Sequence, residues 1–380
     1  TVSVLYCVTA TNASMPSFSR ASSTAVAFCL LVLASPRAAI AWDCVGHMLT
    51  AMVAFERASP DVKIALQPLF DYAQHRYFDQ SVDAELACWP DDMRYVTSAY
   101  ASWQYHDNCY NPTGFPCPNP PPGDLLKALN QSIAKVSDSA VALAERSFWL
   151  SFLISLVGVA HQPLHVTSLY DATFPDGDLS GNRFYIYYQG EPYRLHAMCD
   201  HALDATVAPH TAQPRPVSSN QTYWAAMQQV AKDLATDPLT DEEVHDLDQS
   251  HWSAEGLHLA VTYVYQNHAL PNGSTVNTTY WTNVHTMLRK RVALGGARLA
   301  LILASAVDAA KRTAPHPAPA PSDGSGSKAA AIALSLLIGL VVIGLVVAAV
   351  VKRGQSRRRH VELVDDMPFE ANATGVAAKA

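Results

Sequence analysis

The chain has 380 residues and a formal net charge of −7 at pH 7, and 49% of its residues are hydrophobic while 16% are charged. This apolar-rich composition fits a folded core together with a membrane span. Because no basic stripe runs along the chain, the sequence argues against binding of duplex DNA by charge alone, and any contact with nucleic acid has to be local.

The N-terminal segment, residues 1–41, has the pattern of a leader. Arg20 precedes an apolar run at residues 25–34, and Ala39-Ile40-Ala41 forms a small-x-small cleavage site. We therefore expect a signal peptide that is cut between Ala41 and Trp42. The alternative is a buried core helix, but the apolar run is short and lies at the N-terminus.

The C-terminal region has the pattern of a membrane anchor. Residues 329–351 are apolar and uncharged, which suits a hydrocarbon core that takes roughly 20 helical residues. Basic residues follow at once, beginning with Lys352 and Arg353, so residues 352–380 are expected to be a cytoplasmic tail. Residues 313–328 are rich in Pro, Ala, Gly and Ser and indicate a stalk. The remaining segment, residues 42–312, is then an ectodomain at the cell surface, held by a single span.

Apolar spacing within this ectodomain predicts mainly helices. The helices are expected at residues 43–57, 61–72, 124–136, 140–160, 222–235, 241–267 and 278–311. The helix over residues 140–160 is apolar almost all round and should be central. Residues 183–188 and 192–195 flank Gln189-Gly190-Glu191, which predicts a hairpin. The expected fold class is a single all-α domain with one small β-hairpin, beside the one transmembrane helix.

Cysteines and sequons agree with an ectodomain made in an oxidising compartment. Five cysteines lie outside the leader: Cys44, Cys88, Cys109, Cys117 and Cys199. Disulfides are expected there, and the odd number leaves at least one thiol unpaired or shared with another chain. Cys109 and Cys117 flank a Pro-rich loop and form the easiest local pair. Four glycosylation sequons begin at Asn130, Asn220, Asn272 and Asn277.

Two histidine clusters are candidates for a metal site. Pro163 stops the predicted central helix, which puts His161 and His165 at the end of that helix. His196 and Asp200 are four residues apart and share one helix face. Imidazole plus carboxylate is a normal zinc shell, and three such ligands with an open position mark a catalytic site. Helix capping or a surface position is the alternative for any single histidine, but two clusters joined by a short hairpin favour a metal.

The order of these motifs along the chain resembles the class I nuclease family, the trinuclear-zinc, single-strand-specific nucleases of fungi, plants and trypanosomatids. The resemblance covers about residues 42–306 and implies the helical fold shared with zinc-dependent phospholipase C. Its layout is most similar to the membrane-anchored trypanosomatid 3′-nucleotidase/nucleases. The motifs that carry it are Trp42–His47, Cys88–Arg94, His161–His165, Gly181-Asn182, His196–Asp200, His251–Glu255 and Gly295–Ala300.

The resemblance implies a set of metal ligands. Trp42, through the amine and carbonyl of the mature N-terminus, and His47 would belong to one zinc. Asp91 would be a ligand of another zinc and would help to activate the attacking water. The remaining zinc would have a complete set of protein ligands, namely His165, His196 and Asp200.

The same resemblance implies how a substrate is held. Arg94 would lie near the substrate phosphate. Tyr105 would stack on the base and Asp107 would form hydrogen bonds with it. Stacking tolerates any base and contributes roughly 1–3 kcal/mol per base, so it needs no basic stripe.

Three expected ligand positions depart from the family pattern, where Gln104, Ser155 and Val159 stand. The family binds up to three zinc ions, and only one complete site remains here. His106 could substitute for Gln104 if its loop shifts. His161 is rotated by about 200° from Val159 on the helix and is expected to point away.

The sequence therefore predicts a zinc-dependent phosphodiester hydrolase, an endonuclease or 3′-nucleotidase that acts on single-stranded DNA or RNA or on 3′-nucleotides. One alternative is a catalytically weakened paralogue that binds nucleotides or a partner through the pocket that is the active site in the family. Another is a lipid-head-group phosphodiesterase on the same fold, which the Tyr105 and Asp107 match disfavours. The sequence indicates no particular protein partner.

Overall fold

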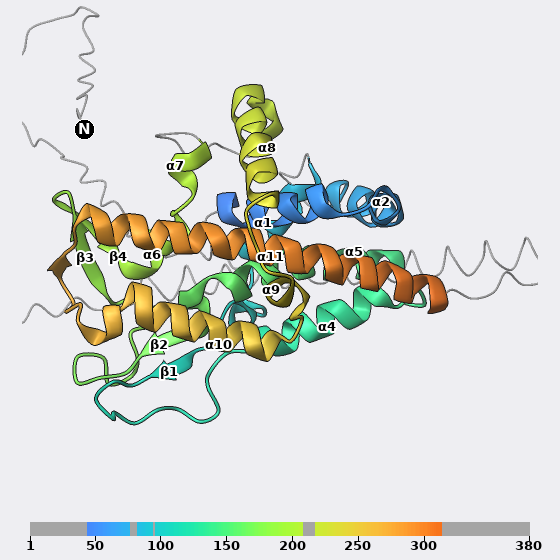
Figure 1. The fold of residues 1–380 in the computed structure, drawn as a ribbon. Helices are drawn as coiled ribbons and strands as arrows, with labels where there is room; N and C mark the ends of the chain where they lie inside the picture. Colours follow the sequence, from blue (N-terminus) through green and yellow to red (C-terminus); the bar gives the residue numbers. More distant parts are fainter. Residues whose placement is uncertain (1–43, 77–81, 94–95, 208–216, 314–380) are drawn as a thin grey trace, which may run out of the picture. The chain divides into compact units, whose positions relative to one another are not determined.

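The computed structural model describes residues 44–76, 82–93, 96–207 and 217–313, which form a mostly helical unit (Figure 1). The helices are α1 (Cys44–Arg57), α2 (Pro60–Gln74), α3 (Trp89–Asp92), α4 (Leu125–Ser137), α5 (Leu143–His161), α6 (Leu195–Asp200), α7 (Asp204–Val207), α8 (Gln221–Ala235), α9 (Asp241–His245), α10 (Gln249–Leu259) and α11 (Thr278–Thr313). The strands are β1 (Asn108–Tyr110), β2 (Thr167–Leu169), β3 (Tyr185–Tyr188), β4 (Glu191–Arg194) and β5 (Ser274–Thr275). The predicted helical fold class is confirmed.

Several predicted features lie outside the described residues. These are the signal peptide, the mature terminus at Trp42, Arg94, the stalk, the transmembrane helix and the cytoplasmic tail. They stay predictions.

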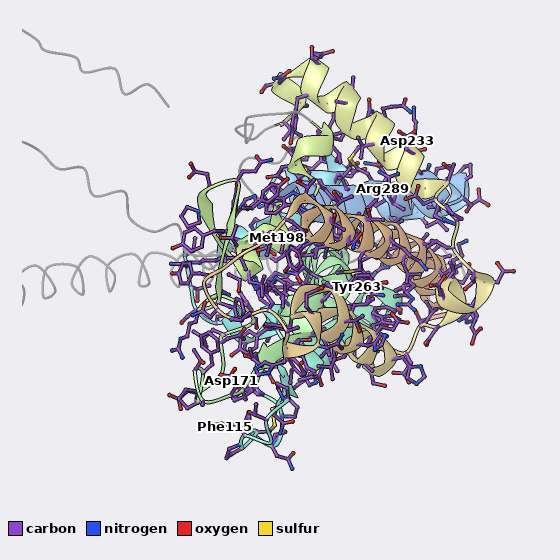
Figure 2. All side chains as sticks on the ribbon, turned by 60° about the vertical axis from the view of Figure 1, so that its left-hand side comes forward. Phe115, Asp171, Met198, Asp233, Tyr263 and Arg289 are labelled. Atoms are coloured by element: carbon purple, nitrogen blue, oxygen red, sulfur yellow. A yellow bond between two sulfur atoms is a disulfide. The ribbon has the colours of Figure 1, made fainter. Side chains whose placement is uncertain are left out.

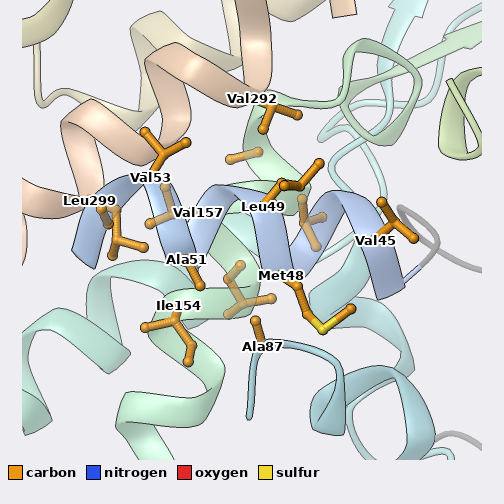
Figure 3. Close-up of a cluster of buried hydrophobic side chains, with 14 of the residues drawn as sticks. Val45, Met48, Leu49, Ala51, Val53, Ala87, Ile154, Val157, Val292 and Leu299 are labelled. Atoms are coloured by element: carbon orange, nitrogen blue, oxygen red, sulfur yellow. The ribbon is translucent and has the colours of Figure 1, made fainter. Parts of the chain in front are cut away.

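Helix α1 lies in the middle of the core, against α5 and α11 (Figure 3). All ten residues from Val45 to Ala54 are buried. Burial of each large aliphatic side chain contributes about 1.5–3 kcal/mol. Close approach of α11 depends on Gly296, because a Cβ there would come within 2.4 Å of the Val53 side chain. The core therefore fixes how α1, α5 and α11 meet.

Helix α5 is central, as its apolar sequence predicts, with every residue from Trp149 to His161 buried. Among the described residues, α5 and α11 are long and apolar enough to cross a membrane. In both helices 72% of the most apolar window is buried inside the domain. Packing within the core thus accounts for their apolar composition.

The helix expected over residues 241–267 is wrong as a single element. The structure has α9, then α10, then a π-helical turn at Ala260–Val264. The Asp248 side chain caps α10 by accepting a hydrogen bond from the Ser250 amide at 2.8 Å. The Asp246 carbonyl accepts a hydrogen bond from the Trp252 indole N–H at 2.7 Å. Local side-chain bonds therefore interrupt a helix that apolar spacing would continue.

The predicted hairpin is present as the antiparallel pair β3 and β4, with Tyr185 opposite Arg194. Two pairings were not predicted. Strand β5 adds to β3 in parallel, and β1 pairs in parallel with β2. Strand β1 lies just after residues 104–107, and the His106 amide donates to the His165 carbonyl at 2.8 Å. This short sheet joins the two segments that form one wall of the candidate site.

The expected disulfide Cys109–Cys117 is present, and Cys44 pairs with Cys88. Cys199 is the free cysteine among the described residues, and it is buried. The Cys44–Cys88 bond closes a separation of 44 residues, which is worth about 4 kcal/mol in the chain-entropy model. It also joins the start of α1 to the residue before α3.

An ionic cluster of two buried arginines and one half-buried glutamate joins α10, α11 and the end of α5. Glu255 of α10 accepts hydrogen bonds from Arg291 at 2.7 Å and from Arg298 at 2.7 and 2.8 Å, both on α11. Arg298 also donates to the His161 ring at 3.1 Å. His161 is completely buried, so it does not cap the helix at the surface, and it is not one of the three residues of the metal-ligand cluster described below.

Burial alone would raise the pKa of Glu255, but the hydrogen bonds and charges of Arg298 and Arg291 outweigh it and lower the pKa to about 2. A carboxylate with a lowered pKa contributes stability that is complete above its ordinary pKa of 4.5 and is lost as the pH falls towards 2.

We predict that Glu255→Gln lowers the free energy of unfolding by about 3 kcal/mol at neutral pH, because two buried guanidinium groups lose their carboxylate. The difference in Tm between the two proteins should shrink as the pH falls from 4.5 towards 2. Calorimetric melts across this pH range measure it. A difference that stays constant with pH would mean that Glu255 does not titrate in the way the cluster requires.

Candidate metal centre and substrate cavity

Three buried side chains that sequence analysis singled out lie together. The ligand atoms of His165, His196 and Asp200 are within 4.8 Å of one another. The Nε2 atom of His196 is 3.3 Å from Asp200 Oδ2, and that of His165 is 3.8 Å from Asp200 Oδ1. His196 and Asp200 come from α6, whereas His165 comes from the 3₁₀ turn Pro163–Val166 after α5.

Local structure explains how His165 reaches this position. Helix α5 ends at His161, and Gln162 adopts an extended conformation before Pro163 begins the 3₁₀ turn. The Gln162 side chain accepts a hydrogen bond from the Leu164 amide at 2.5 Å and donates to Asp200 Oδ1 at 2.8 Å. One glutamine therefore caps the turn and positions the carboxylate.

Both histidines are oriented by backbone carbonyls. The Nδ1 atom of His165 donates to the Gln104 carbonyl at 2.5 Å, and that of His196 donates to the Ser180 carbonyl at 2.6 Å. A neutral imidazole that donates through Nδ1 carries its lone pair on Nε2. Both Nε2 atoms thus present lone pairs towards the oxygens of Asp200, which is the arrangement that orients histidine ligands around a metal.

The charge balance of this cluster also fits a cation. Burial raises the pKa of Asp200 to about 6, although His196 and Gln162 oppose the rise, and nearby Asp91 adds to it. An ionised carboxylate at this depth needs a positive charge beside it. Two imidazole nitrogens and one carboxylate with an open position suit one zinc ion.

A second, incomplete group lies around His47 and Asp91. The Nε2 atom of His47 is 3.6 Å from Asp91 Oδ2, and its Nδ1 atom is 3.5 Å from the Ser155 hydroxyl. His47 and Asp91 each follow a cysteine of the Cys44–Cys88 bond by three residues, so this disulfide brings their segments together. Val159, one turn after Ser155, is completely buried and offers no ligand atom. This donor set does not fit a metal bridged to the first site.

A cavity of about 420 Å³ opens beside the three-residue cluster. His165 and His196 line it, together with Gln104, Tyr105 and Asp107. Gly123 packs directly against the backbone of Tyr105. It has a φ of +102°, and there is no room for a side chain, since a Cβ would lie 2.1 Å from the Tyr105 carbonyl oxygen. Two of the candidate metal ligands, His165 and His196, thus share one cavity with the candidate base-binding residues.

Asp107 is almost fully buried at the wall of this cavity, and its Oδ1 accepts a hydrogen bond from the Ser180 hydroxyl at 2.6 Å. Burial raises the pKa of Asp107 to about 7, while the Ser180 hydrogen bond opposes the rise and Asp178 adds to it. Asp107 therefore changes its protonation state near neutral pH, and with it changes from donor and acceptor to acceptor alone.

Sequence analysis missed two positioning residues, Gln162 and Ser180. Gln162 lies within the His161–His165 motif and holds Asp200. Ser180 precedes the Gly181-Asn182 motif and serves both Asp107 and His196. Their place inside or beside a motif was the available signal, but a glutamine or serine has no spacing that marks such a role.

The structure does not bring His106 into the cluster as a substitute ligand. His106 is half-buried, and burial lowers the pKa of its imidazole. Among the described residues it belongs neither to the three ligands nor to the lining of the cavity. Gln104 is one of the residues that line the cavity, and its backbone carbonyl orients His165.

Comparison with known proteins assigns the family. The S1/P1 nuclease family model matches residues 42–308, and the chain belongs to this family of zinc-dependent nucleases. Endonuclease 3 of Arabidopsis thaliana is 24% identical over 296 residues, which cover 73% of this chain and 92% of that protein. Nuclease P1 of Penicillium citrinum is 25% identical over 281 residues, which cover 68% and 95%. Membership supports a phosphodiesterase of the nuclease type.

We predict that Asp200→Asn raises the Tm of the metal-free protein and abolishes its stabilisation by zinc. Because the pKa of Asp200 is raised in the folded state, the metal-free protein loses stability as the pH rises from 3.8 to 6. At neutral pH the loss amounts to about 3 kcal/mol. The neutral amide avoids this cost, so the metal-free Tm should rise by roughly 5–10 °C. Thermal melts with and without zinc measure both effects.

The matched control is Asp176→Asn, since Asp176 is an exposed carboxylate at the rim of the same cavity. This variant should keep the zinc-dependent rise in Tm. Zinc stabilisation that survives Asp200→Asn would place the metal elsewhere.

Proposed function

We propose that this chain is a zinc-dependent phosphodiester hydrolase that cleaves single-stranded nucleic acid or 3′-nucleotides. One observation carries the proposal: a single cavity is lined by His165 and His196 of the candidate metal centre and by Tyr105 and Asp107. A cavity of about 420 Å³ accommodates one unpaired nucleotide better than a duplex.

A zinc ion held by His165, His196 and Asp200 would polarise a phosphate oxygen and lower the pKa of a bound water. The other tasks fall to the side chains. Tyr105 offers a face on which a base can stack, and Asp107 offers hydrogen-bonding oxygens to the edge of that base. Asp91, buried beside His47, is a carboxylate that can take up a proton.

The cellular setting is part of the same proposal. Two disulfides indicate folding in an oxidising compartment, which agrees with passage through the secretory pathway. We propose that the signal peptide is removed before Trp42 and that the span at residues 329–351 holds the enzyme at the cell surface.

A second candidate function is a weakened paralogue that binds nucleotides. The observation in its favour is the donor set around His47 and Asp91, where Ser155 contributes only a neutral hydroxyl and Val159 no ligand atom. Fewer metal ions share less of the charge that develops on the phosphate, so hydrolysis is expected to be slow.

We predict that the purified protein cleaves single-stranded DNA slowly and that Gln104→His, Ser155→His and Val159→Asp together raise both zinc content and rate. Ser155 and Val159 face one side of α5, where His47 lies, and Gln104 lines the cavity. Each added metal should raise the rate by at least about tenfold, which corresponds to 1.4 kcal/mol in the barrier. Zinc analysis and cleavage of a labelled oligonucleotide measure the two effects.

The matched control replaces Val159→Asp with Val159→Asn in the same triple variant, since the amide has the same shape and no charge. This control should gain less zinc and less activity. Wild-type protein that already binds three zinc ions and cleaves rapidly would contradict the assignment of these three positions as lost ligands.

We further predict that the affinity of the metal-free protein for guanosine rises by up to about tenfold as the pH increases through 7, because ionised Asp107 accepts two N–H bonds from the base. Asp107→Asn should remove this pH dependence, and Asp176→Asn should leave it in place. Calorimetric titrations at several pH values test it. A step that persists in Asp107→Asn would assign the titration to another group.

A further inference from the structure

A second cavity, of about 500 Å³, lies between α10 with its π-helical turn and α11. It shares no lining residue with the cavity beside the candidate metal centre. Its apolar lining comes from Leu259, Tyr263, Met287 and Leu294, and Lys290 and Arg291 are among its polar lining. Figure 2 labels Tyr263, which is 38% exposed and marks this face of the molecule.

The ionic cluster behind this cavity, which includes Arg298, contains more positive than negative charge. Arg291 and Arg298 are both buried and share the single carboxylate of Glu255. Lys290 is balanced by Glu243 at 2.6 Å. His161 adds no charge, since burial and both arginines keep the pKa of its ring well below the ordinary value. One positive charge therefore remains uncompensated.

The excess charge is located at Arg291. Its Nε donates to the His161 carbonyl at 3.2 Å and its Nη1 donates to Glu255 at 2.7 Å. Its Nη2 has no hydrogen-bond partner among the described residues, although the side chain is only 4% exposed. By contrast, all three guanidinium nitrogens of Arg298 donate hydrogen bonds.

A buried cationic donor without an acceptor is costly, because its lost hydration is not replaced. Burial lowers the pKa of Arg291 even though Glu255 raises it, which is the direction expected of an incompletely compensated charge. An anion in the cavity would supply both the missing charge and the missing acceptor.

We propose that this second cavity binds an organic monoanion, a carboxylate on an apolar body, with the carboxylate beside the Arg291 guanidinium and the body against Leu259, Tyr263 and Met287. A single negative charge matches the single uncompensated positive charge. A dianion such as a phosphate monoester would overcompensate it close to the carboxylates of Glu255 and Glu243. This site is separate from the proposed nuclease site.

The test uses 4-phenylbutyrate as the probe and the full-length protein. Calorimetry should detect one bound probe per chain, and the probe should raise the Tm. Arg291→Met should weaken binding by about tenfold or more, because it removes the donor and the excess charge. This variant leaves Arg298 and Glu255 as a one-to-one pair, so we expect it to fold. Arg289→Met is the matched control, since Arg289 lies on the same helix, is paired with Asp237 and does not line the cavity (Figure 2).

Two further measurements keep the proposal open to refutation. Thr286→Trp fills the cavity from its exposed rim without touching the ionic cluster and should also weaken binding. The neutral 4-phenylbutanamide and the small anion acetate should both bind more weakly than the probe. The proposal fails if Arg291→Met or Thr286→Trp binds the probe as tightly as wild type, if the amide binds equally well, or if guanosine displaces the probe.

Discussion

The end of α5 is the point at which the buried core and both charged clusters of this protein meet. His161 accepts hydrogen bonds from Arg291 at its carbonyl and from Arg298 at its ring. The next residue, Gln162, donates to Asp200 in the candidate metal centre. Because a buried helix leaves its last carbonyls and side chains without water, each of these groups must find a protein partner. The ionic cluster and the metal-ligand cluster are therefore held to the core by two consecutive residues.

This arrangement explains why the candidate metal centre is rigid on one side and incomplete on the other. His165, His196 and Asp200 are each fixed by a hydrogen bond to a carbonyl or to Gln162, so their geometry does not depend on a metal. Such fixed orientation favours tight and selective metal binding. Around His47, the facing side of α5 contributes Ser155 and the apolar Val159. Two of the three positions that depart from the family pattern, Ser155 and Val159, thus lie on the face of α5 towards α1, and the end of the same helix keeps its polar contacts.

Several residues of the candidate site were singled out from the sequence, but the reasons differ between residues. His196 and Asp200 are recognisable because a four-residue spacing puts them on one helix face. Tyr105 and Asp107 could be proposed as base-binding residues only by resemblance to a family, since neither their spacing nor their neighbours mark them. Ser180 was missed, because its hydroxyl donates to Asp107 and its carbonyl accepts from His196. Both partners are distant from Ser180 in the chain, so local sequence does not indicate these hydrogen bonds.

The sequence by itself determined the mostly helical class, the central position of α5, the β3–β4 hairpin and the Cys109–Cys117 disulfide, because each depends on residues close together in the chain. Only the tertiary structure decided the break between α9 and α10, the pairing of β1 with β2, and the meeting of the His165 turn with α6. It also decided that two buried arginines share one glutamate, which leaves Arg291 facing a second cavity. These features join segments tens of residues apart, and hydrophobic periodicity reports only which side of an element is buried, not which partner buries it.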